Sequence, residues 1–330
     1  MAVKNCQHYG QHPPQQGGSL DFGGHGSALT SDPNAACLRI VNGVPCNKEH
    51  RDEFFRQLPA SIGGDQVWQK GSNVLLVSMC DLTVTRDDRD AWLGKAAIAQ
   101  NAVFRNNSIP EFDFALPLVA LTEPSGATHE EKVNGQRKYF LTSKSTAYAP
   151  RHPKGGRDTR KLGQHRVLLK KLHDPDNGVV VVLRCEDRER HLFGPDVDCD
   201  AWNREAEGYN YSDLMNTTFA LVPGGRSPGT YRLLETMLSG ALPVFVDQFS
   251  EGGLEDVRPF DGQVPWEALS VRVPASALAG LVPALRTWTA VEVVGARAEA
   301  LEVAEKVLSR TSAGLLRAFE MRLVRGSAWR

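Results

Sequence analysis

The stretch from residue 219 to residue 247 constrains the fold of this chain more than any other feature of its sequence. Residues 219–222 form a short apolar run, which is typical of a strand buried in a parallel sheet. A glycine-rich turn follows, and then a segment that predicts a helix capped by Ser227 and ended by Gly240. Residues 243–247 form the next apolar run. The stretch therefore predicts a strand–turn–helix–strand unit of an open α/β sheet.

The glycine turn of this unit is suited to bind an anion. Gly224 and Gly225 let the backbone approach a ligand closely, and the free N–H groups of a helix N-terminus attract negative charge. Arg226 adds a planar fork that matches phosphate oxygens. The pattern is neither a Walker A loop nor GxGxxG. The residues alone support two interpretations equally: a diphosphate site at the carboxyl edge of a parallel sheet, or a tight turn with a surface arginine.

The residues in and around this unit resemble the exostosin-like glycosyltransferase family, whose members build heparan-sulfate backbones and decorate plant cell-wall polysaccharides. The central likeness is the pattern LVPxGRxxGxxRxLE…PV, carried here by Leu221-Val222-Pro223, Gly225-Arg226, Gly229, Arg232, Leu234-Glu235 and Pro243-Val244. Weaker likenesses occur in the family's order at Thr30-Ser31-Asp32-Pro33, Phe104-Arg105, Phe112-Asp113, Asp158-Thr159-Arg160, His173 and Tyr209-Asn210-Tyr211. Together they cover residues 26–322.

The resemblance implies an α/β fold of the GT-B type, with two facing Rossmann-like domains on parallel sheets and a C-terminal helix. The alternation of strand-like and helix-like segments agrees with this fold. Further strands are expected over residues 38–41, 74–78, 139–143, 179–184 and 270–273, with an extended segment over 112–117. Helices are expected over residues 91–102, 159–172 and 276–287, and a short one ends at 213–216. An apolar stripe from Leu301 to Leu323 predicts a last helix, which either packs on its own domain or braces the first one.

Composition divides the chain into four parts. We expect a disordered polar segment over residues 1–25 and a polar linker over 121–137. The resemblance implies that residues 26–120 form an N-terminal acceptor-side domain and residues 138–325 a C-terminal nucleotide-sugar-binding domain. The family's first strand and its N-terminal membrane helix have no counterpart in the sequence. The N-terminal domain is therefore expected to be either truncated or a divergent short form.

The resemblance also implies a UDP-sugar donor held by the C-terminal domain. The expected donor-binding residues are Arg160, Gly225, Arg226, Gly229, Thr230, Arg232 and Glu235. Arg226 and the helix N-terminus would stabilise the leaving diphosphate, so no metal and no cofactor is expected. Glu235 would accept hydrogen bonds from donor hydroxyls or pair with Arg232 on the same helix face, and the two roles are compatible. Arg160 lies in a basic stretch, residues 144–173, which is either a solvated helix face or a contact for an anionic ligand.

No motif marks the base that would deprotonate the acceptor. Such a base is a carboxylate or histidine within hydrogen-bond reach of the acceptor hydroxyl. Asp81 and Asp113 are the candidates because they adjoin strand-like segments, and a structural role is the competing interpretation for each. The sequence Asp198-Cys199-Asp200 has the form of a metal-binding Asp-x-Asp motif but is expected to be a solvated loop.

Two features predict a lumenal compartment. By resemblance to the family, Cys185 and Cys199 close a disulfide, and Asn216 begins an N-x-Thr glycosylation triplet. The 38 basic and 39 acidic residues nearly cancel, so no overall charge attracts the chain to nucleic acid. No apolar run reaches the ~18 residues of a membrane span. We therefore expect the Golgi lumen or another part of the secretory pathway.

The sequence predicts an inverting, metal-independent glycosyltransferase that moves a hexosyl or pentosyl group from a UDP-sugar to a glycan, with a related glycosyltransferase subunit as a partner. The alternative is a catalytically silent exostosin-like subunit that scaffolds such a complex. The donor pattern favours the first function, and the unmatched acceptor-side motif favours the second. A glycoside hydrolase needs two carboxylates that flank one bond, and the sequence places no such pair.

Overall fold

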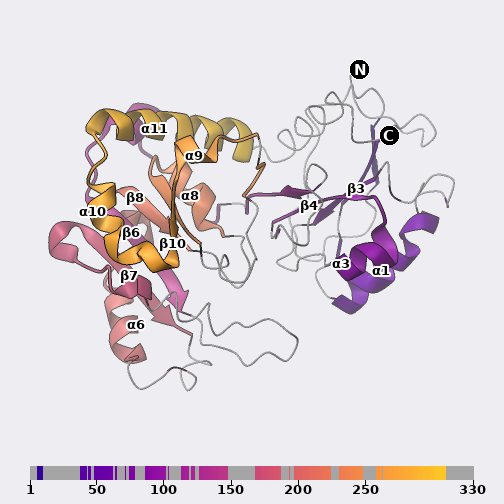
Figure 1. The fold of residues 1–330 in the computed structure, drawn as a ribbon, viewed down its shortest axis with the longest axis horizontal. Helices are drawn as coiled ribbons and strands as arrows, with labels where there is room; N and C mark the ends of the chain where they lie inside the picture. Colours follow the sequence, from indigo (N-terminus) through magenta and orange to yellow (C-terminus); the bar gives the residue numbers. More distant parts are fainter. Residues whose placement is uncertain are drawn as a thin grey trace.

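The computed structural model describes the chain in segments. These are residues 6–9, 38–42, 44–45, 48–61, 64, 71, 74–78, 86–101, 103, 113–118, 120–122, 126–147, 168–186, 193, 197–223, 230–247, 258–261 and 263–309. They form two five-stranded sheets in which all named strands pair in parallel, with helices packed beside them (Figure 1). These sheets confirm the predicted α/β fold with two Rossmann-like domains, the plan of the GT-B type.

The first sheet has the strand order β1-β2-β3-β4-β5. Its strands are β1 (Cys6–Tyr9), β2 (Leu38–Asn42), β3 (Val74–Ser78), β4 (Ala97–Gln100) and β5 (Phe114–Ala115). The helices of this half are α1 (Lys48–Ser61), α3 (Arg86–Asp88) and the π-helical η3 (Arg89–Leu93). The five residues of β3 are all buried, which explains why its sequence is apolar on both faces.

Two predictions in this half are wrong. The helix expected over residues 91–102 ends at Leu93, and Ala97–Gln100 is the buried strand β4. Gly94 at positive φ (52°) ends the helix, and the following alanines fit between two neighbouring strands. Within the segment expected to be disordered, Cys6–Tyr9 pairs with β2 as the edge strand β1. Backbone hydrogen bonds can form an edge strand without an apolar side-chain pattern, so composition gives no signal for it.

The second sheet has the order β10-β9-β8-β6-β7. Its strands are β6 (Tyr139–Ala147), β7 (Val179–Cys185), β8 (Thr217–Val222), β9 (Leu242–Asp247) and β10 (Val271–Pro274). Its helices are α4 (His129–Asn134), η5 (Pro175–Asn177), α6 (Cys199–Glu207), α7 (Tyr211–Leu214), α8 (Arg232–Leu238), α9 (Trp266–Leu269), η7 (Ala275–Gly280), α10 (Leu281–Leu285), α11 (Ala290–Val303) and η8 (Ala304–Leu308). The predicted strands of this half are therefore confirmed, with β6 longer than expected.

The predicted strand–helix–strand unit is β8-α8-β9, and Gly240 ends its helix as expected. Gly240 has φ +72°, its N–H donates to the carbonyl of Met237 (3.0 Å), and the N–H of Ala241 donates to that of Thr236 (3.1 Å). These two bonds form a Schellman motif, which satisfies the last carbonyls of α8. The start differs from the prediction, since α8 begins at Arg232 and Thr230 is not helical. The predicted cap, Ser227, lies outside the described residues.

The last described helix packs on its own domain. Helix α11 contacts α4, α8, α9 and β9, and buries Ala300 and Leu301. It continues into η8, whose Ala304 and Leu308 are also buried. Across the described part of the chain, no single helix has the length and apolarity of a membrane span; by those two criteria alone a bent pair, 275–285 with 290–308, would pass.

The two halves of the chain are joined by a continuous apolar core and by backbone pairing. One buried cluster includes residues of the first sheet, such as Leu75 and Phe114, together with residues of the second sheet, such as Phe219. The N–H of Phe260, which follows β9 in the chain, donates to the carbonyl of Ala115 in β5 (3.0 Å). A segment of the C-terminal half thus extends the edge of the first sheet.

Candidate functional site

The predicted donor site lies at the carboxyl end of β8, where helix α8 follows the strand. Ligands of open parallel sheets bind at this edge because helix N-termini and loops converge there. Thr230, Arg232 and Glu235 are described by the structure. Four other expected donor residues, Arg160, Gly225, Arg226 and Gly229, lie outside the described residues, as does the base candidate Asp81. Their assignments stay predictions.

Arg232 is buried beneath this edge and ties two strands together. Its Nε donates to the carbonyl of Leu221 in β8 (2.8 Å), and its Nη2 lies 3.2 Å and 3.3 Å from the carbonyl and hydroxyl oxygens of Thr142 in β6. The guanidinium carbon lies 5.5 Å from the centre of the Tyr211 ring. Burial lowers the pKa of Arg232 from its ordinary value. These contacts make Arg232 a structural support of the site.

The carboxylate of Glu235 is also buried, and its partners come from two distant segments. Oε1 accepts the backbone N–H groups of Leu121 and Thr122, each at 3.0 Å, and Oε2 accepts the hydroxyl of Tyr211. Among the described residues these contacts replace the expected pairing with Arg232, whose guanidinium donates to Leu221 and Thr142 instead. The role of Glu235 toward a donor stays a prediction.

The structure adds Tyr211 to the residues that the sequence predicts for the site. Burial, followed by weaker effects that include its contact with Glu235, raises the pKa of Tyr211 to about 12. The hydroxyl therefore stays protonated at neutral pH and donates to the carboxylate. Its place in the Tyr209-Asn210-Tyr211 likeness is the one sequence signal that pointed to it.

The middle of β6 adds polar groups beside this network. Thr142 donates its hydroxyl to the carbonyl of Leu214 (2.8 Å), and Lys144 donates to the carbonyl of Tyr209 (2.7 Å). Burial, with a smaller contribution from Arg184, lowers the pKa of Lys144. These bonds hold the segment that carries Tyr211 against β6.

Thr230 lies two residues before Arg232, the first residue of α8. Its hydroxyl oxygen is 3.3 Å from the backbone nitrogen of Arg232, the first residue of the helix. The side chain therefore sits at the free N–H groups of the first helical turn. Its predicted contact with a donor diphosphate is not tested by this arrangement and stays a prediction.

The described base candidate, Asp113, is buried in the first sheet. Its Oδ2 lies 2.6 Å from Nη2 of Arg89, and its Oδ1 accepts the N–H of Ile98 (3.0 Å). Arg89 also donates to the carbonyl of Ala96 (2.7 Å). The pair thereby joins η3, β4 and β5, which is a structural function. Its assignment as a general base stays a prediction.

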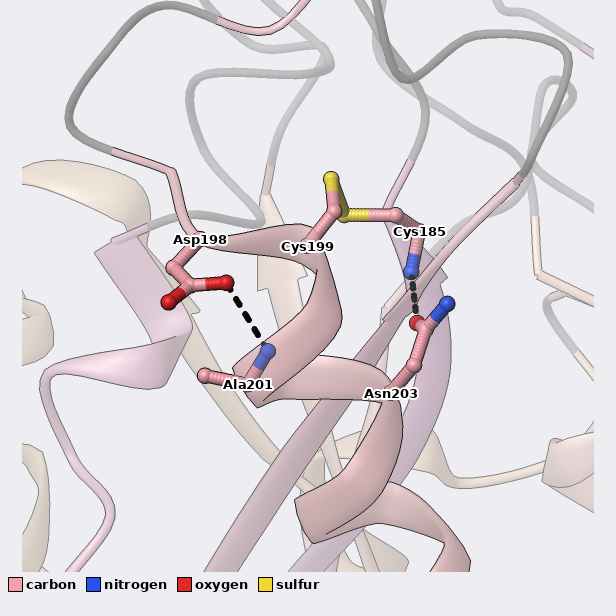
Figure 2. Close-up of a disulfide and its surroundings, with 5 residues drawn as sticks. All are labelled: Cys185, Asp198, Cys199, Ala201 and Asn203. Carbon is pink, nitrogen blue, oxygen red and sulfur yellow. Dashed lines mark hydrogen bonds between the residues drawn. A yellow bond between two sulfur atoms is a disulfide. The ribbon is translucent and has the colours of Figure 1, made fainter.

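The disulfide implied by the resemblance is present between Cys185 at the end of β7 and Cys199 at the start of α6 (Figure 2). Asn203 accepts the N–H of Cys185 (2.8 Å), and Asp198 caps α6 by accepting the N–H of Ala201 (2.9 Å). Asp198 thus has a helix-capping role in place of the expected solvated loop. In the parts of the chain that the structure describes, no group of three His, Cys, Asp or Glu residues could hold a metal; metal independence stays a prediction.

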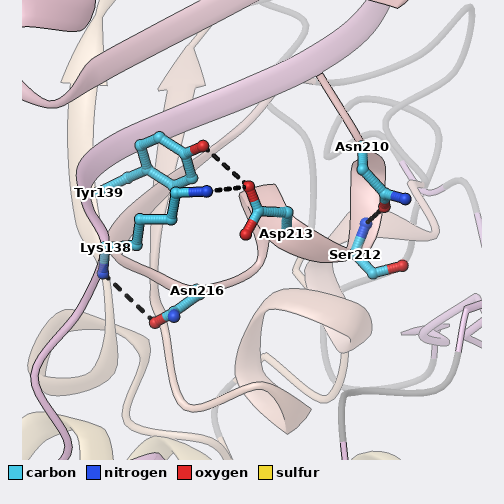
Figure 3. A network of polar contacts seen from close by, with 6 residues as sticks. All are labelled: Lys138, Tyr139, Asn210, Ser212, Asp213 and Asn216. Atoms are coloured by element: carbon cyan, nitrogen blue, oxygen red, sulfur yellow. Dashed lines mark hydrogen bonds and ion pairs between the residues drawn. The ribbon is translucent and has the colours of Figure 1, made fainter. Parts of the chain in front are cut away.

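Asn216, the predicted glycosylation acceptor, is exposed in the turn between α7 and β8. Figure 3 shows it beside a surface network in which Asp213 accepts from Lys138 (2.6 Å) and from the hydroxyl of Tyr139 (2.9 Å). The ion pair with Lys138 is the largest cause that lowers the pKa of Asp213. The network fixes the start of β6 against α7, and glycosylation of Asn216 stays a prediction.

Known proteins similar to this chain share the same family. The sequence profile of the Exostosin GT47 domain matches residues 19–287. The Exostosin-1 homolog of Caenorhabditis elegans is 28% identical over 257 residues, which are 74% of this chain and 63% of that protein. Exostosin-1a of Danio rerio is 27% identical over 251 residues, 73% of this chain and 32% of that protein. Exostosin-1 of Bos taurus has the same identity and coverage.

The chain therefore spans less than two thirds of the length of these relatives. Solved structures are more distant. The lipopolysaccharide glycosyltransferase WaaG has 12% identity and a TM-score of 0.40, with 87% of this chain and 75% of that chain covered. The sheet topology of this chain therefore defines its fold. The family is shown by the sequence profile, which extends from the N-terminal segment through α10. The chain belongs to the Exostosin GT47 domain family.

Proposed function

We propose that this chain is a glycosyltransferase that moves a sugar, with inversion and without a metal, from a UDP-sugar to a glycan acceptor. Membership of the Exostosin GT47 domain family over residues 19–287 carries this proposal, because the matched region contains the second parallel sheet with its β8-α8-β9 unit and strands β2 to β5 of the first sheet. The related Exostosin-1 proteins are longer than this chain, so their activities enter here as part of the proposal.

The architecture of the C-terminal sheet supports a donor site at the start of α8. A sugar nucleotide carries its negative charge on the diphosphate, and that charge increases as the sugar departs. We propose that Arg226, with the backbone of Gly225, Gly229 and Thr230, receives this charge, and that Arg160 adds a second contact. Arg232 supports the site from below through its bonds to β6 and β8.

Glu235 supports the same assignment through its remaining acceptor capacity. An ionised carboxylate has about four acceptor positions. Leu121, Thr122 and Tyr211 occupy three of them, two at Oε1 and one at Oε2. Among the residues that the structure describes, no fourth donor contacts this carboxylate, and we propose that a hydroxyl group of the donor takes the remaining position. For the acceptor side we favour Asp81 as the base, since both oxygens of Asp113 are engaged in the first sheet.

The disulfide supports a compartment for this function. Disulfides persist in oxidising compartments such as the lumen of the secretory pathway. The Cys185–Cys199 bond therefore supports the Golgi lumen or another part of that pathway, where glycan acceptors are also found. A related glycosyltransferase subunit is the partner that we propose there.

A silent subunit is the second candidate function. It is favoured by the structural engagement of Asp113 and by an acceptor-side segment, residues 79–88, that does not match the family pattern. A silent subunit would bind a donor or a partner without turning over any UDP-sugar.

A calorimetric titration of UDP into the purified chain, with a chelator present, tests the proposal. We expect saturable binding that Arg226→Ala weakens by about 10-fold or more, because an arginine–phosphate contact is a charge-assisted bond. Arg204→Ala is the matched control, since Arg204 is an exposed arginine on α6, and it should leave the affinity unchanged.

Absence of UDP binding by folded wild-type chain under these conditions would refute the proposed metal-independent donor site. If UDP binds, a panel of UDP-sugars incubated with oligosaccharide acceptors separates the two functions. Turnover of one UDP-sugar would support the transferase. Binding without turnover across the panel would favour the silent subunit.

A further inference from the structure

Glu235 connects the predicted donor site to the linker between the two halves of the chain. Leu121 and Thr122 are the first residues of that linker, and they lie 114 and 113 positions from Glu235 in the sequence. Both of their N–H groups point to the same carboxylate oxygen, at 3.0 Å. The first two residues of the linker are therefore bonded to a side chain of helix α8.

Backbone hydrogen bonds, and not apolar burial, hold this point of the linker. The residue Leu121 is 72% exposed, whereas Glu235 is 4% exposed. A charged carboxylate that is buried requires hydrogen bonds for its stability, and here the linker N–H groups supply two of them. The cost of releasing the linker thus includes leaving a buried carboxylate without these two partners.

Tyr211 fixes the orientation of the same carboxylate from the opposite oxygen. Its hydroxyl donates to Oε2, and its ring lies against the guanidinium of Arg232, which is bonded to both β6 and β8. The carboxylate is consequently held between a rigid part of the C-terminal sheet and the linker. Within the described part of the chain, Tyr211 is the one donor to Oε2, and the second acceptor position of that oxygen is the one that a ligand hydroxyl would use.

We propose that Glu235 acts as an interdomain latch, with Tyr211 as its positioning residue, so that order of the linker at Leu121–Thr122 and occupancy of the donor site stabilise each other. The proposal rests on the proposed donor site at α8. The linker N–H groups hold the carboxylate in one orientation, so a ligand hydroxyl that binds Oε2 has less conformational freedom to remove when the linker is in place, and the coupling is positive. Because such coupling is reciprocal, ligand binding must protect the linker by the same factor by which linker order improves ligand binding.

A second contact between the two halves of the chain lies close to the linker and does not depend on Glu235. Phe260 donates its N–H to the carbonyl of Ala115, so the edge of β5 is fixed to the C-terminal half six positions before Leu121, where the linker begins. The segment between these two attachments, at Ala115 and Leu121, is short. Releasing the latch therefore frees the linker while the sheet contact remains, which confines the expected change to residues near 121 and 122.

Hydrogen–deuterium exchange at the amides of Leu121 and Thr122, resolved by fragmentation mass spectrometry, tests the latch in the absence of ligand. Glu235→Ala should raise the exchange rate of these two amides by about 10-fold or more, the effect of losing a bond to a charged acceptor. Tyr211→Phe should raise it less but in the same direction. Glu235→Gln should retain most of the protection, because its carbonyl oxygen can still accept both N–H groups.

The matched control is Tyr139→Phe, which removes a tyrosine hydroxyl from a 2.9 Å bond to Asp213 on the surface of the same domain. It should leave both amides unchanged. Rates in β3 and β7 serve as a measure of global stability, and an increase there in parallel with residues 121 and 122 would indicate general destabilisation and overturn the latch. Unchanged exchange at both amides in Glu235→Ala would also overturn it.

The coupling is tested with UDP as the probe. In the wild-type chain, saturating UDP should slow exchange at both amides, and Tyr211→Phe should weaken UDP binding about fivefold, the effect of one hydrogen bond. If UDP binds but exchange at residues 121 and 122 does not respond, the coupling is refuted and the proposed function stands. If folded wild-type chain binds no UDP, the proposed function and the coupling both fail, while exchange in the variants still decides whether Glu235 holds the linker.

Discussion

Removing the Cys185–Cys199 disulfide should destabilise the C-terminal domain by an amount that the loop length sets. The two cysteines are separated by 14 positions, and a cross-link of this span removes conformational entropy from the unfolded chain that corresponds to ~3 kcal/mol at 25 °C. For a domain of the size of residues 138–325, this corresponds to a decrease in Tm of about 6–12 °C. Both cysteines are buried, so their replacement also leaves a small cavity.

The variant to measure is Cys185→Ala combined with Cys199→Ala, compared with wild-type chain in the oxidised and reduced states by urea unfolding. Reduced wild-type chain keeps both sulfur atoms, so its loss of stability isolates the cross-link. The additional loss in the double variant isolates the cavity. The dependence of unfolding free energy on urea should also increase, because an unfolded chain without the cross-link exposes more surface.

Added reductant is the internal control of this experiment. It should lower the stability of wild-type chain and leave the double variant unchanged. If oxidised wild type and the double variant unfold at the same urea concentration, the assigned role of the disulfide in joining β7 to α6 is wrong. The same conclusion would follow if reduction of the wild type has no effect.

Three further predictions follow from single positions. Gly240→Ala should lower the free energy of unfolding in urea by about 2–5 kcal/mol, because φ is +72° and a Cβ would lie 2.3 Å from the carbonyl oxygen of Lys132. The control is Gly295→Ala, in a helix with open space around it, which should raise the free energy of unfolding by up to about 1 kcal/mol. Equal effects of the two substitutions would refute this prediction. Asp113→Asn should lower the free energy of unfolding by about 3–5 kcal/mol, because it leaves the buried Arg89 without its charge partner. Loss of transfer activity at an unchanged Tm would instead identify Asp113 as the base. The capping hydrogen bond from the N–H of Thr289 is the largest cause that lowers the pKa of Glu292. The stabilisation by this bond is therefore present above the ordinary pKa of 4.5 and is lost as the pH falls below that value. In Glu292→Gln the free energy of unfolding should depend less on pH in this range, and an unchanged pH dependence would contradict the assignment.

The elements that could be predicted from the sequence are those specified by their own residues. The run of valines in β7 is buried on both faces, and no neighbour is needed to recognise it as a strand. Gly240 ends α8 because the left-handed conformation at that position favours glycine. The alanines of β4 predict a helix because alanine is the best helix former, and burial of the segment between β3 and β5 overrides that preference.

The candidate site divides in the same way. The sequence by itself determined the family, the order of strand, turn and helix around α8, and the pair of cysteines that forms the disulfide, because these depend on residue identity and short spacing. Only the tertiary structure decided that Glu235 bonds to the linker and Tyr211 while Arg232 bonds to β6 and β8. The sequence does not show which of many N–H groups will donate to a given carboxylate. Partners more than a hundred residues away are selected by the packing of the two sheets.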